Sequence, residues 1–275
     1  MITRIHIVLL IIFTSFEAIH AQKGTELGGW IGASHYFGDL NNLYRLNEPG
    51  LAGGIIARYN VNSRLSPQIM LNCARVRAHD SKSSNLFDRR RNLSFYSDIF
   101  EICPSLSFNF FPFVHGKSYL GASPHLITGL SIFYFNPKAD YQGKSYALRN
   151  LGTEGQPKNQ EYSSISAAWL VGFGIKVDLS YRWSLNVDLN TRISFTDYLD
   201  DVSGTYPNLA SVQIEHGSIA VALSDPSIPG INGEKIGRQG FQRGDGKDKD
   251  MFASFGVGLL YFFGRLDCPK ISNNY

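Results

Sequence analysis

The stretch Trp183-Ser-Leu-Asn-Val-Asp-Leu-Asn-Thr-Arg-Ile-Ser-Phe195 decides the fold class of this chain. Its odd-numbered positions carry apolar side chains, broken only by Thr191, and its even-numbered positions carry polar ones. Such alternation separates the two kinds of side chain onto opposite faces of a β-strand, whereas a helix would scatter them around its axis. The stretch therefore predicts a strand with one apolar and one polar wall.

The same alternation recurs along the chain and predicts eight strands in all. Their ranges are 27–37, 51–61, 65–79, 98–111, 118–135, 165–179, 183–195 and 251–263, of which the third is the least regular. The connections alternate in length: 60–64, 112–117 and 180–182 are short, whereas 38–50, 80–97, 136–163 and 199–250 are long. Short turns at one end and long loops at the other are typical of an outer-membrane barrel.

We therefore predict an all-β fold, a transmembrane antiparallel β-barrel with eight strands, short periplasmic turns and long extracellular loops. An even strand number would put both chain ends in the periplasm. A soluble barrel of the lipocalin type also alternates, with its polar residues outside. The membrane barrel is favoured by long strands, by aromatic residues near strand ends and by glycines on the polar faces, where they leave room for larger neighbours inside a narrow barrel.

The predicted division of the chain is a signal peptide at 1–21, the barrel at 22–263 and a periplasmic tail at 264–275. Arg4 precedes a short apolar run at 7–13, and Ile19-His20-Ala21 resembles a cleavage site. The run is too short to span the roughly 30 Å hydrocarbon core of a bilayer, so we expect cleavage rather than anchoring. The expected location is the cell outer membrane.

Composition excludes several other classes of protein. An apolar content of 43% opposes disorder, and a net charge of +3 is too weak to indicate nucleic acid as a partner. The three cysteines, an odd number, form neither a disulfide framework nor a zinc-binding spacing. We expect no cofactor and no bound metal.

The polar faces of the strands carry charges of both signs. An eight-stranded barrel is only wide enough for its own side chains, so these charges should meet inside it. We predict a paired network that fills the lumen, and the alternative is an ion path lined by the same groups. The residues are Glu26, Arg58, Glu101, Lys176, Asp178, Asp188 and Arg192.

No convincing catalytic constellation emerges, and we expect the protein not to be an enzyme. Ser123 and His125 share an inward face and would serve a lipid hydrolase, but a histidine within the polar network is the simpler interpretation. Acidic residues in 244–250 could bind calcium, and Arg89-Arg90-Arg91 could meet lipopolysaccharide phosphates. Hydrated loops are the simpler interpretation of both segments.

Short motifs are spread over nearly the whole mature chain. They are GDL at 38–40, RNLSF at 91–95, DIFE at 98–101, FNFFP at 108–112, FYFNPK at 133–138, GVGLLYFF at 256–263 and DCPK at 267–270. In these motifs the chain resembles the PorG family of outer-membrane barrels from the type IX secretion system of Bacteroidota. The loops at 150–161 and 199–250 match nothing in that pattern.

The resemblance implies a non-enzymatic outer-membrane component of a machine that exports proteins and, in some bacteria, supports gliding motility. It further implies association with the periplasmic ring of PorK and PorN. The alternatives are a lipid-modifying hydrolase of the outer membrane and a surface adhesin that uses the long loops.

A ring beneath the membrane would contact the few periplasmic segments of such a barrel. We hypothesise that the contact comes from the turn at 112–117 and from the tail, through His115, Arg265, Cys268, Pro269 and Lys270. Cys268 would be the only cysteine in an oxidising, accessible compartment and could pair with a partner cysteine, unless it remains a free thiol.

Overall fold

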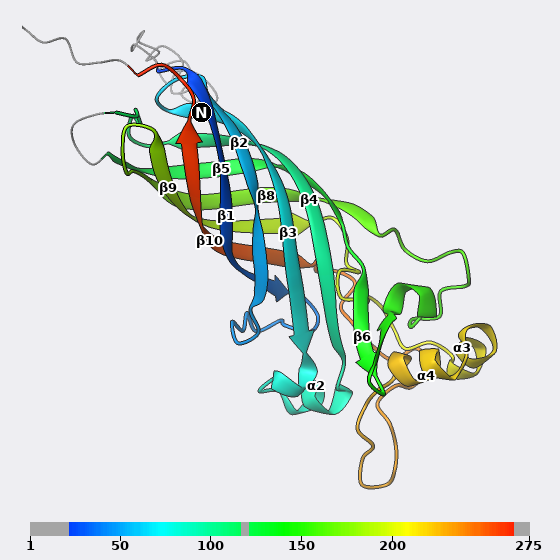
Figure 1. The fold of residues 1–275 in the computed structure, drawn as a ribbon. Helices are drawn as coiled ribbons and strands as arrows, with labels where there is room; N and C mark the ends of the chain where they lie inside the picture. The colour runs from blue at the N-terminus through cyan, green and yellow to red at the C-terminus, as the bar shows by residue number, and fades with distance from the viewer. Residues whose placement is uncertain (1–21, 117–120, 267–275) are drawn as a thin grey trace, which may run out of the picture.

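The computed structural model describes residues 22–116 and 121–266 of the chain. Eight long antiparallel strands form its main body (Figure 1). They are β1 (Gly24–Phe37), β2 (Gly50–Asn60), β3 (Leu65–His79), β4 (Ser94–Asn109), β5 (Ala122–Tyr134), β8 (Ile165–Asp178), β9 (Trp183–Ser194) and β10 (Met251–Phe262). The predicted signal peptide and most of the predicted tail lie outside the described residues.

These strands close on themselves to form a barrel. Neighbours in the ring follow one another along the chain, with β5 paired to β8, and the pairing of β1 with β10 completes the circle. A closed barrel leaves no unpaired strand edge, which is the condition for a β-sheet to cross a bilayer. The eight-stranded antiparallel barrel predicted from the alternation is therefore confirmed.

The predicted strand limits agree with the observed ones to within a few residues. The third strand matches at both ends, and β9 ends one residue earlier than the prediction. The largest difference is in β4, which starts at Ser94 rather than residue 98. β5 starts at Ala122, and the predicted strand residues 118–120 lie outside the described part of the chain. The early start of β4 follows from its pairing with β3, which continues from Asp98 back to Ser94.

The apolar face of each strand points outward. Phe173, Leu189 and Phe255 on three adjacent strands are 52%, 52% and 54% exposed. Ser184 and Asn186, at the alternate positions of β9, are fully buried. An apolar outer wall around a polar interior is the pattern of a transmembrane barrel, because the bilayer replaces water as the outer solvent. This orientation is the predicted one. Among the described residues, no helix is long and apolar enough to span a membrane.

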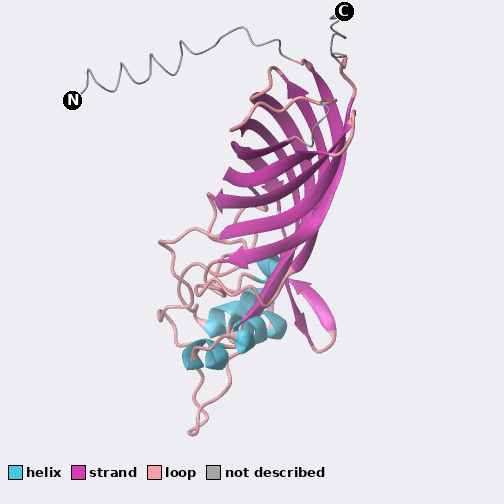
Figure 2. Cartoon of the chain, turned by 90° about the vertical axis from the view of Figure 1, so that its left-hand side faces the viewer, coloured by secondary structure: helices cyan, strands magenta, loops and turns pink. Residues whose placement is uncertain are grey.

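The long connections gather at one end of the barrel and fold into a structure that we call the cap, made of residues 38–49, 80–93, 135–164 and 195–250 (Figure 2). Its elements are η1 (Asp80–Lys82), α2 (Leu86–Arg91), β6 (Pro137–Tyr141), β7 (Lys144–Ala147), η2 (Leu148–Leu151), α3 (Leu209–His216) and α4 (Ser218–Ser224). The other end, which we call the turn end, holds the short connections, the start of β1 and the end of β10 (Figure 1). The sequence predicts loops for these connections, whereas the structure folds parts of them into the β6–β7 hairpin and short helices.

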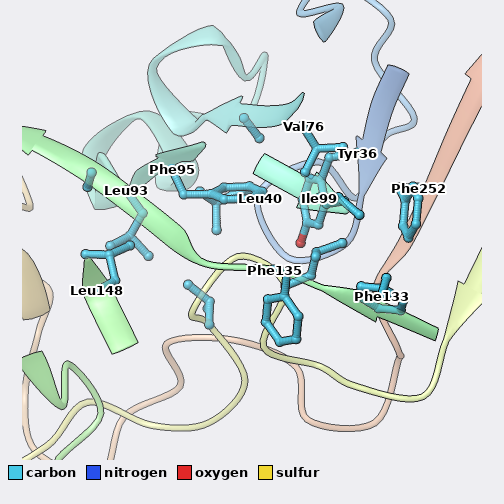
Figure 3. Packing of buried hydrophobic residues seen from close by; sticks show 14 of the residues in the cluster. Tyr36, Leu40, Val76, Leu93, Phe95, Ile99, Phe133, Phe135, Leu148 and Phe252 are labelled. Carbon is cyan, nitrogen blue, oxygen red and sulfur yellow. The ribbon is translucent and has the colours of Figure 1, made fainter. Parts of the chain in front are cut away.

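A hydrophobic cluster joins the cap to the barrel (Figure 3). Strand residues such as Tyr36, Phe95 and Phe133 pack there against cap residues such as Leu40 and Leu148, and all five are at most 4% exposed. Burial of this apolar surface stabilises the folded cap. The cap residues involved have no regular spacing in the sequence, which is why periodicity did not reveal them.

Candidate functional site

Ion pairs occupy the lumen in layers, and the layer nearest the cap centres on Glu101. Its carboxylate accepts hydrogen bonds from Nε and Nη2 of Arg192, at 3.1 and 3.0 Å, and from the amide of Asn72 at 2.8 Å. Both charged side chains are 2% exposed. The bidentate geometry offsets the cost of removing two charges from water.

A second polar layer lies toward the turn end. Arg58 donates to Glu26 at 3.0 Å and to the side-chain oxygen of Gln68 at 2.9 Å. Lys176, which is also buried, donates to the hydroxyl of Ser107 at 3.0 Å. Four of the seven predicted lumen residues therefore form two direct ion pairs, and Lys176 instead bonds a neutral group.

An apolar layer lies between these two polar layers along the strands. Its buried members are Ile56, Met70, Cys103, Ile127, Leu170 and Leu260, with Trp30 packed against them. Glycines make the space for the indole: a Cβ on Gly256 would lie 2.6 Å from Cε3 of Trp30. The inward glycines thus make room for a large neighbour, as predicted, and buried side chains from several strands lie in the lumen.

Two histidines pair with the remaining carboxylates of the predicted network. Nε2 of His125 lies 3.0 Å from Asp188, and Nδ1 of His115 lies 3.3 Å from Asp178. Nε2 of His115 also lies 3.0 Å from Glu26. The sequence predicts His125 within this network but not His115, because His115 comes from a connection rather than from an alternating strand.

The position of His115 corrects an expectation. The residue was expected on the periplasmic surface as a partner contact, but its side chain is 1% exposed and stacks on Phe262 at a ring distance of 4.5 Å. The turn folds back into the barrel mouth, where Nε2 of the imidazole hydrogen-bonds the buried Glu26 and Nδ1 lies beside Asp178. Its side chain is therefore not available to another protein in this structure.

Gln22 fastens this turn to both ends of the barrel chain. Its amide nitrogen donates to the carbonyl oxygens of His115 and Arg265, at 3.1 and 3.3 Å, and its oxygen accepts from the His115 N–H at 2.7 Å. Three distant segments thus meet at the turn end, where Arg265 is exposed. Sequence reasoning missed Gln22, and the expected contacts of Cys268, Pro269 and Lys270 lie outside the described residues.

The structure does not assemble the nucleophile and base of the hydrolase alternative. The Ser123 hydroxyl bonds to the backbone of Phe111, accepting from N at 3.0 Å and donating to O at 2.9 Å. The His125 ring faces Asp188 instead. No hydrogen bond joins Ser123 to His125, so this pair lacks the contact that would activate the serine.

Buried acids lie where the cap meets the barrel. The phenol oxygen of Tyr36 is 2.6 Å from Asp200 and 2.7 Å from Asp250. A phenol has one hydrogen to donate, so one of the two carboxyls must hold a proton to complete the second bond. Burial raises the pKa of both Asp200 and Asp250 well above the usual range, in agreement with this shared proton.

Two buried arginines tie the cap segments together. Arg243 donates to Glu154 at 3.1 Å and to the carbonyl oxygen of Asp201 at 2.6 Å. Arg91 donates to Asp80 at 2.7 Å and to the carbonyl oxygen of Arg243 at 2.8 Å. Arg91 is thus a structural residue of the cap, and the 89–91 run does not form a free triple-arginine site for lipid phosphates.

The loop at 244–250, for which calcium binding was the alternative to a hydrated loop, is also part of the cap framework. The Asp245 N–H donates to Asp39 at 2.8 Å, which holds the loop against the segment after β1. Within 22–116 and 121–266, no group of three or more His, Cys, Asp or Glu residues is arranged to hold a metal ion.

The geometry can be compared with that of known proteins. The solved structures that are similar include neisserial surface protein A, at 11% identity and a TM-score of 0.43, covering 87% of this chain and 97% of that one. OprG of Pseudomonas aeruginosa is 9% identical at a TM-score of 0.40, covering 89% and 98%. Ail of Yersinia pestis, in complex with a heparin analogue, is 9% identical at 0.39, covering 88% and 97%.

No curated protein matches the chain. A family described as a domain of unknown function matches residues 3–222, which is most of the chain. The chain is therefore a transmembrane β-barrel of the outer-membrane type that belongs to the family DUF6089.

Proposed function

We propose that this protein is a non-enzymatic outer-membrane component of the type IX protein secretion machinery and associates with the periplasmic PorK/PorN ring. The observation that carries the proposal is the filled lumen, in which two ion-paired layers flank an apolar layer around Trp30. A barrel filled in this way works through what binds at its ends rather than through what passes inside it. The resemblance of its motifs to the PorG family supports the specific machine.

In this proposal the turn end faces the periplasm and the cap faces the outside. The turn end is a suitable anchoring surface because Gln22 holds the start of β1, the 112–116 turn and the segment after β10 in one arrangement. A preordered surface loses less conformational entropy when a partner binds. The exposed Arg265 belongs to this surface, and the predicted tail residues Cys268, Pro269 and Lys270 continue from it.

Co-purification of the ring with the tagged full-length protein tests the anchoring role. The expected result is recovery of PorK and PorN with the complete chain and reduced recovery with a chain truncated after Gly264. Full recovery with the truncated chain and normal secretion would remove the tail from the proposal. Failure to recover the ring with the complete chain would overturn the anchoring role itself. Non-reducing gels of Cys268→Ser test the disulfide separately.

The filled lumen has its own test. The protein in planar bilayers should give no steady large conductance, and incubation with lipid A or phospholipids should give no turnover. Turnover that disappears in His125→Ala would instead establish the hydrolase. The control is Ser184→Ala, because Ser184 is a second buried lumen hydroxyl that does not belong to the Ser123–His125 pair.

One observation favours a second function, that of a surface adhesin. The cap is a folded unit that displays large apolar side chains, including Ile214 at 85% and Ile231 at 105% exposure. Exposed apolar groups of this kind are common in interaction surfaces. Binding of whole cells to host matrix that disappears in Ile214→Ser/Ile231→Ser, with ring recovery unchanged, would establish this function.

A further inference from the structure

Among the described residues, the exposed and half-buried charges at the turn end are all positive. Lys23, Arg64 and Arg265 are exposed and Arg182 is half-buried. Each lies in a connection or terminal segment just beyond a strand: before β1, between β2 and β3, between β8 and β9, and after β10. We call these four residues the basic rim.

The acids of the same region are buried and already paired. In the described segments that form this end (22–26, 59–66, 108–116, 121–123, 176–185 and 261–266), the acidic residues are Glu26 and Asp178. Glu26 bonds Arg58 and His115, and Asp178 lies beside His115. Among the described residues, none of the basic rim forms an ion pair.

Hydrogen bonds set the positions of two of these charges. Nη1 of Arg64 donates to the carbonyl oxygen of Phe110 at 2.7 Å. Nη1 of Arg182 donates to those of Phe262 and Gly264, at 3.0 and 3.3 Å. The backbone of Arg265 is held by Gln22. The guanidinium groups of Arg64 and Arg182 are therefore fixed beside the barrel mouth.

The outer wall beneath the rim is aromatic. Trp183 and Tyr261 pack against each other at a ring distance of 5.0 Å, and Tyr261 packs against Phe263 at 4.8 Å. Such a cluster marks the boundary between lipid and water on a barrel wall. The rim residues belong to the connections just beyond that aromatic cluster, outside the apolar wall.

We infer that the basic rim docks an acidic surface of a periplasmic protein, which, on the function proposed above, is the ring. Fixed cations in front of a complementary acidic surface raise the rate and the specificity of association. They also suit protein docking better than headgroup binding, because lipids adapt to cations in any arrangement. The basic rim would give the proposed contact between the turn end and the ring an electrostatic basis in addition to the tail.

The test reverses two rim charges in the full-length protein, Lys23→Glu with Arg265→Glu, chosen because neither side chain forms a hydrogen bond within 22–116 and 121–266. The matched control is Lys144→Glu with Lys247→Glu, two exposed cap lysines. Heat-modifiable migration on gels verifies that each barrel has folded. We expect ring recovery to fall by roughly tenfold or more in the rim variant, to fall with added salt in the parent, and to be unchanged in the control.

The outcomes separate the inference from the function on which it rests. Equal recovery with the rim variant and the parent would overturn the basic rim and leave the anchoring role in place. Absence of the ring from the parent sample would overturn the anchoring role. Unchanged ring recovery together with lost retention of anionic phospholipid, measured by native mass spectrometry, would overturn protein docking and assign the rim to lipid headgroups.

Discussion

Val187 on β9 is a single residue whose environment the bilayer sets. It points outward, in register with Val257 of β10 and Ile175 of β8, within the apolar wall. Val187→Arg should weaken folding into vesicles by roughly 2–4 kcal/mol, because a charge near the midplane loses its hydration. Urea titration of the refolded protein measures the change, and Val187→Leu is the control. Equal stability of the arginine variant would contradict the outward orientation.

Gly256 is a single residue whose environment the lumen sets. A Cβ at this position would lie 2.6 Å from the Trp30 ring and 2.9 Å from the carbonyl oxygen of Ile31. Gly256→Val should therefore destabilise the barrel by about 1–3 kcal/mol through overpacking. Thermal unfolding in detergent measures this effect.

A smaller residue opposite should relieve part of that strain. Trp30→Ala combined with Gly256→Val should be more stable than the sum of the two single changes predicts, since the valine then occupies part of the space of the indole. Strict additivity of the two changes would show that they do not meet in the lumen. The control for this non-additivity is the pair Trp30→Ala and Ala33→Val, in which the added methyl groups lie on the outer wall.

Among the elements, the cap depends on Arg243 for its internal connections. This buried arginine holds Glu154 of one connection and the Asp201 backbone of another, and it also donates to the carbonyl oxygen of Ser224 at 3.3 Å. Arg243→Met would leave Glu154 buried without its cation, a loss of about 3–5 kcal/mol for such pairs. We expect rapid protease cleavage within 195–250 while the strands remain intact.

The control for this element is an exposed arginine of the same segment. Arg238→Met removes a charge from the cap surface and should leave the cleavage rate unchanged. Limited proteolysis followed by mass spectrometry locates the cuts. Resistance of the Arg243 variant would mean that the apolar cluster around Leu40 and Leu148 holds the cap without the arginine.

For the molecule as a whole, the stability of the junction between barrel and cap should depend on pH. Burial raises the pKa of Asp39 to about 7 and those of Asp197 and Asp201 to about 6. A carboxyl whose folded pKa is raised stabilises the fold below its unfolded pKa, and this contribution is lost as the pH rises through the folded value. The cap should therefore be more stable at about pH 4–5 than at pH 8, with most of the loss complete by about pH 7.

Hydrogen exchange of residues 195–250, corrected for the intrinsic effect of pH, measures this dependence. Asp197→Asn should reduce it because one of the ionising groups is removed, whereas Asp248→Asn alters an exposed acid and should not. A cap that becomes more protected as the pH rises would contradict the prediction.

Most of the barrel followed from sequence alone, and its outward and inward faces did as well. The residues of β9 show why. Every second position along the strand lies on the same face, so the side chains of Leu185 and Asn186 indicate the outward and the inward face without any distant contact. The polar network was foreseen as a set of inward charges for the same reason. Its actual pairs, such as Glu101 with Arg192, required the register of strands that are distant along the chain.

The local alternation could be read from neighbouring residues, and with it the strands, their outward and inward faces and the bilayer as outer solvent, because period two needs no distant contact. The inward turn of His115, the junction of three segments at Gln22 and the contact of Tyr36 with Asp200 and Asp250 appear only in the folded molecule. These residues lie in connections or at strand ends and come from positions up to 243 residues apart. Their contacts are set by closure of the barrel and burial of the cap, which no local pattern encodes.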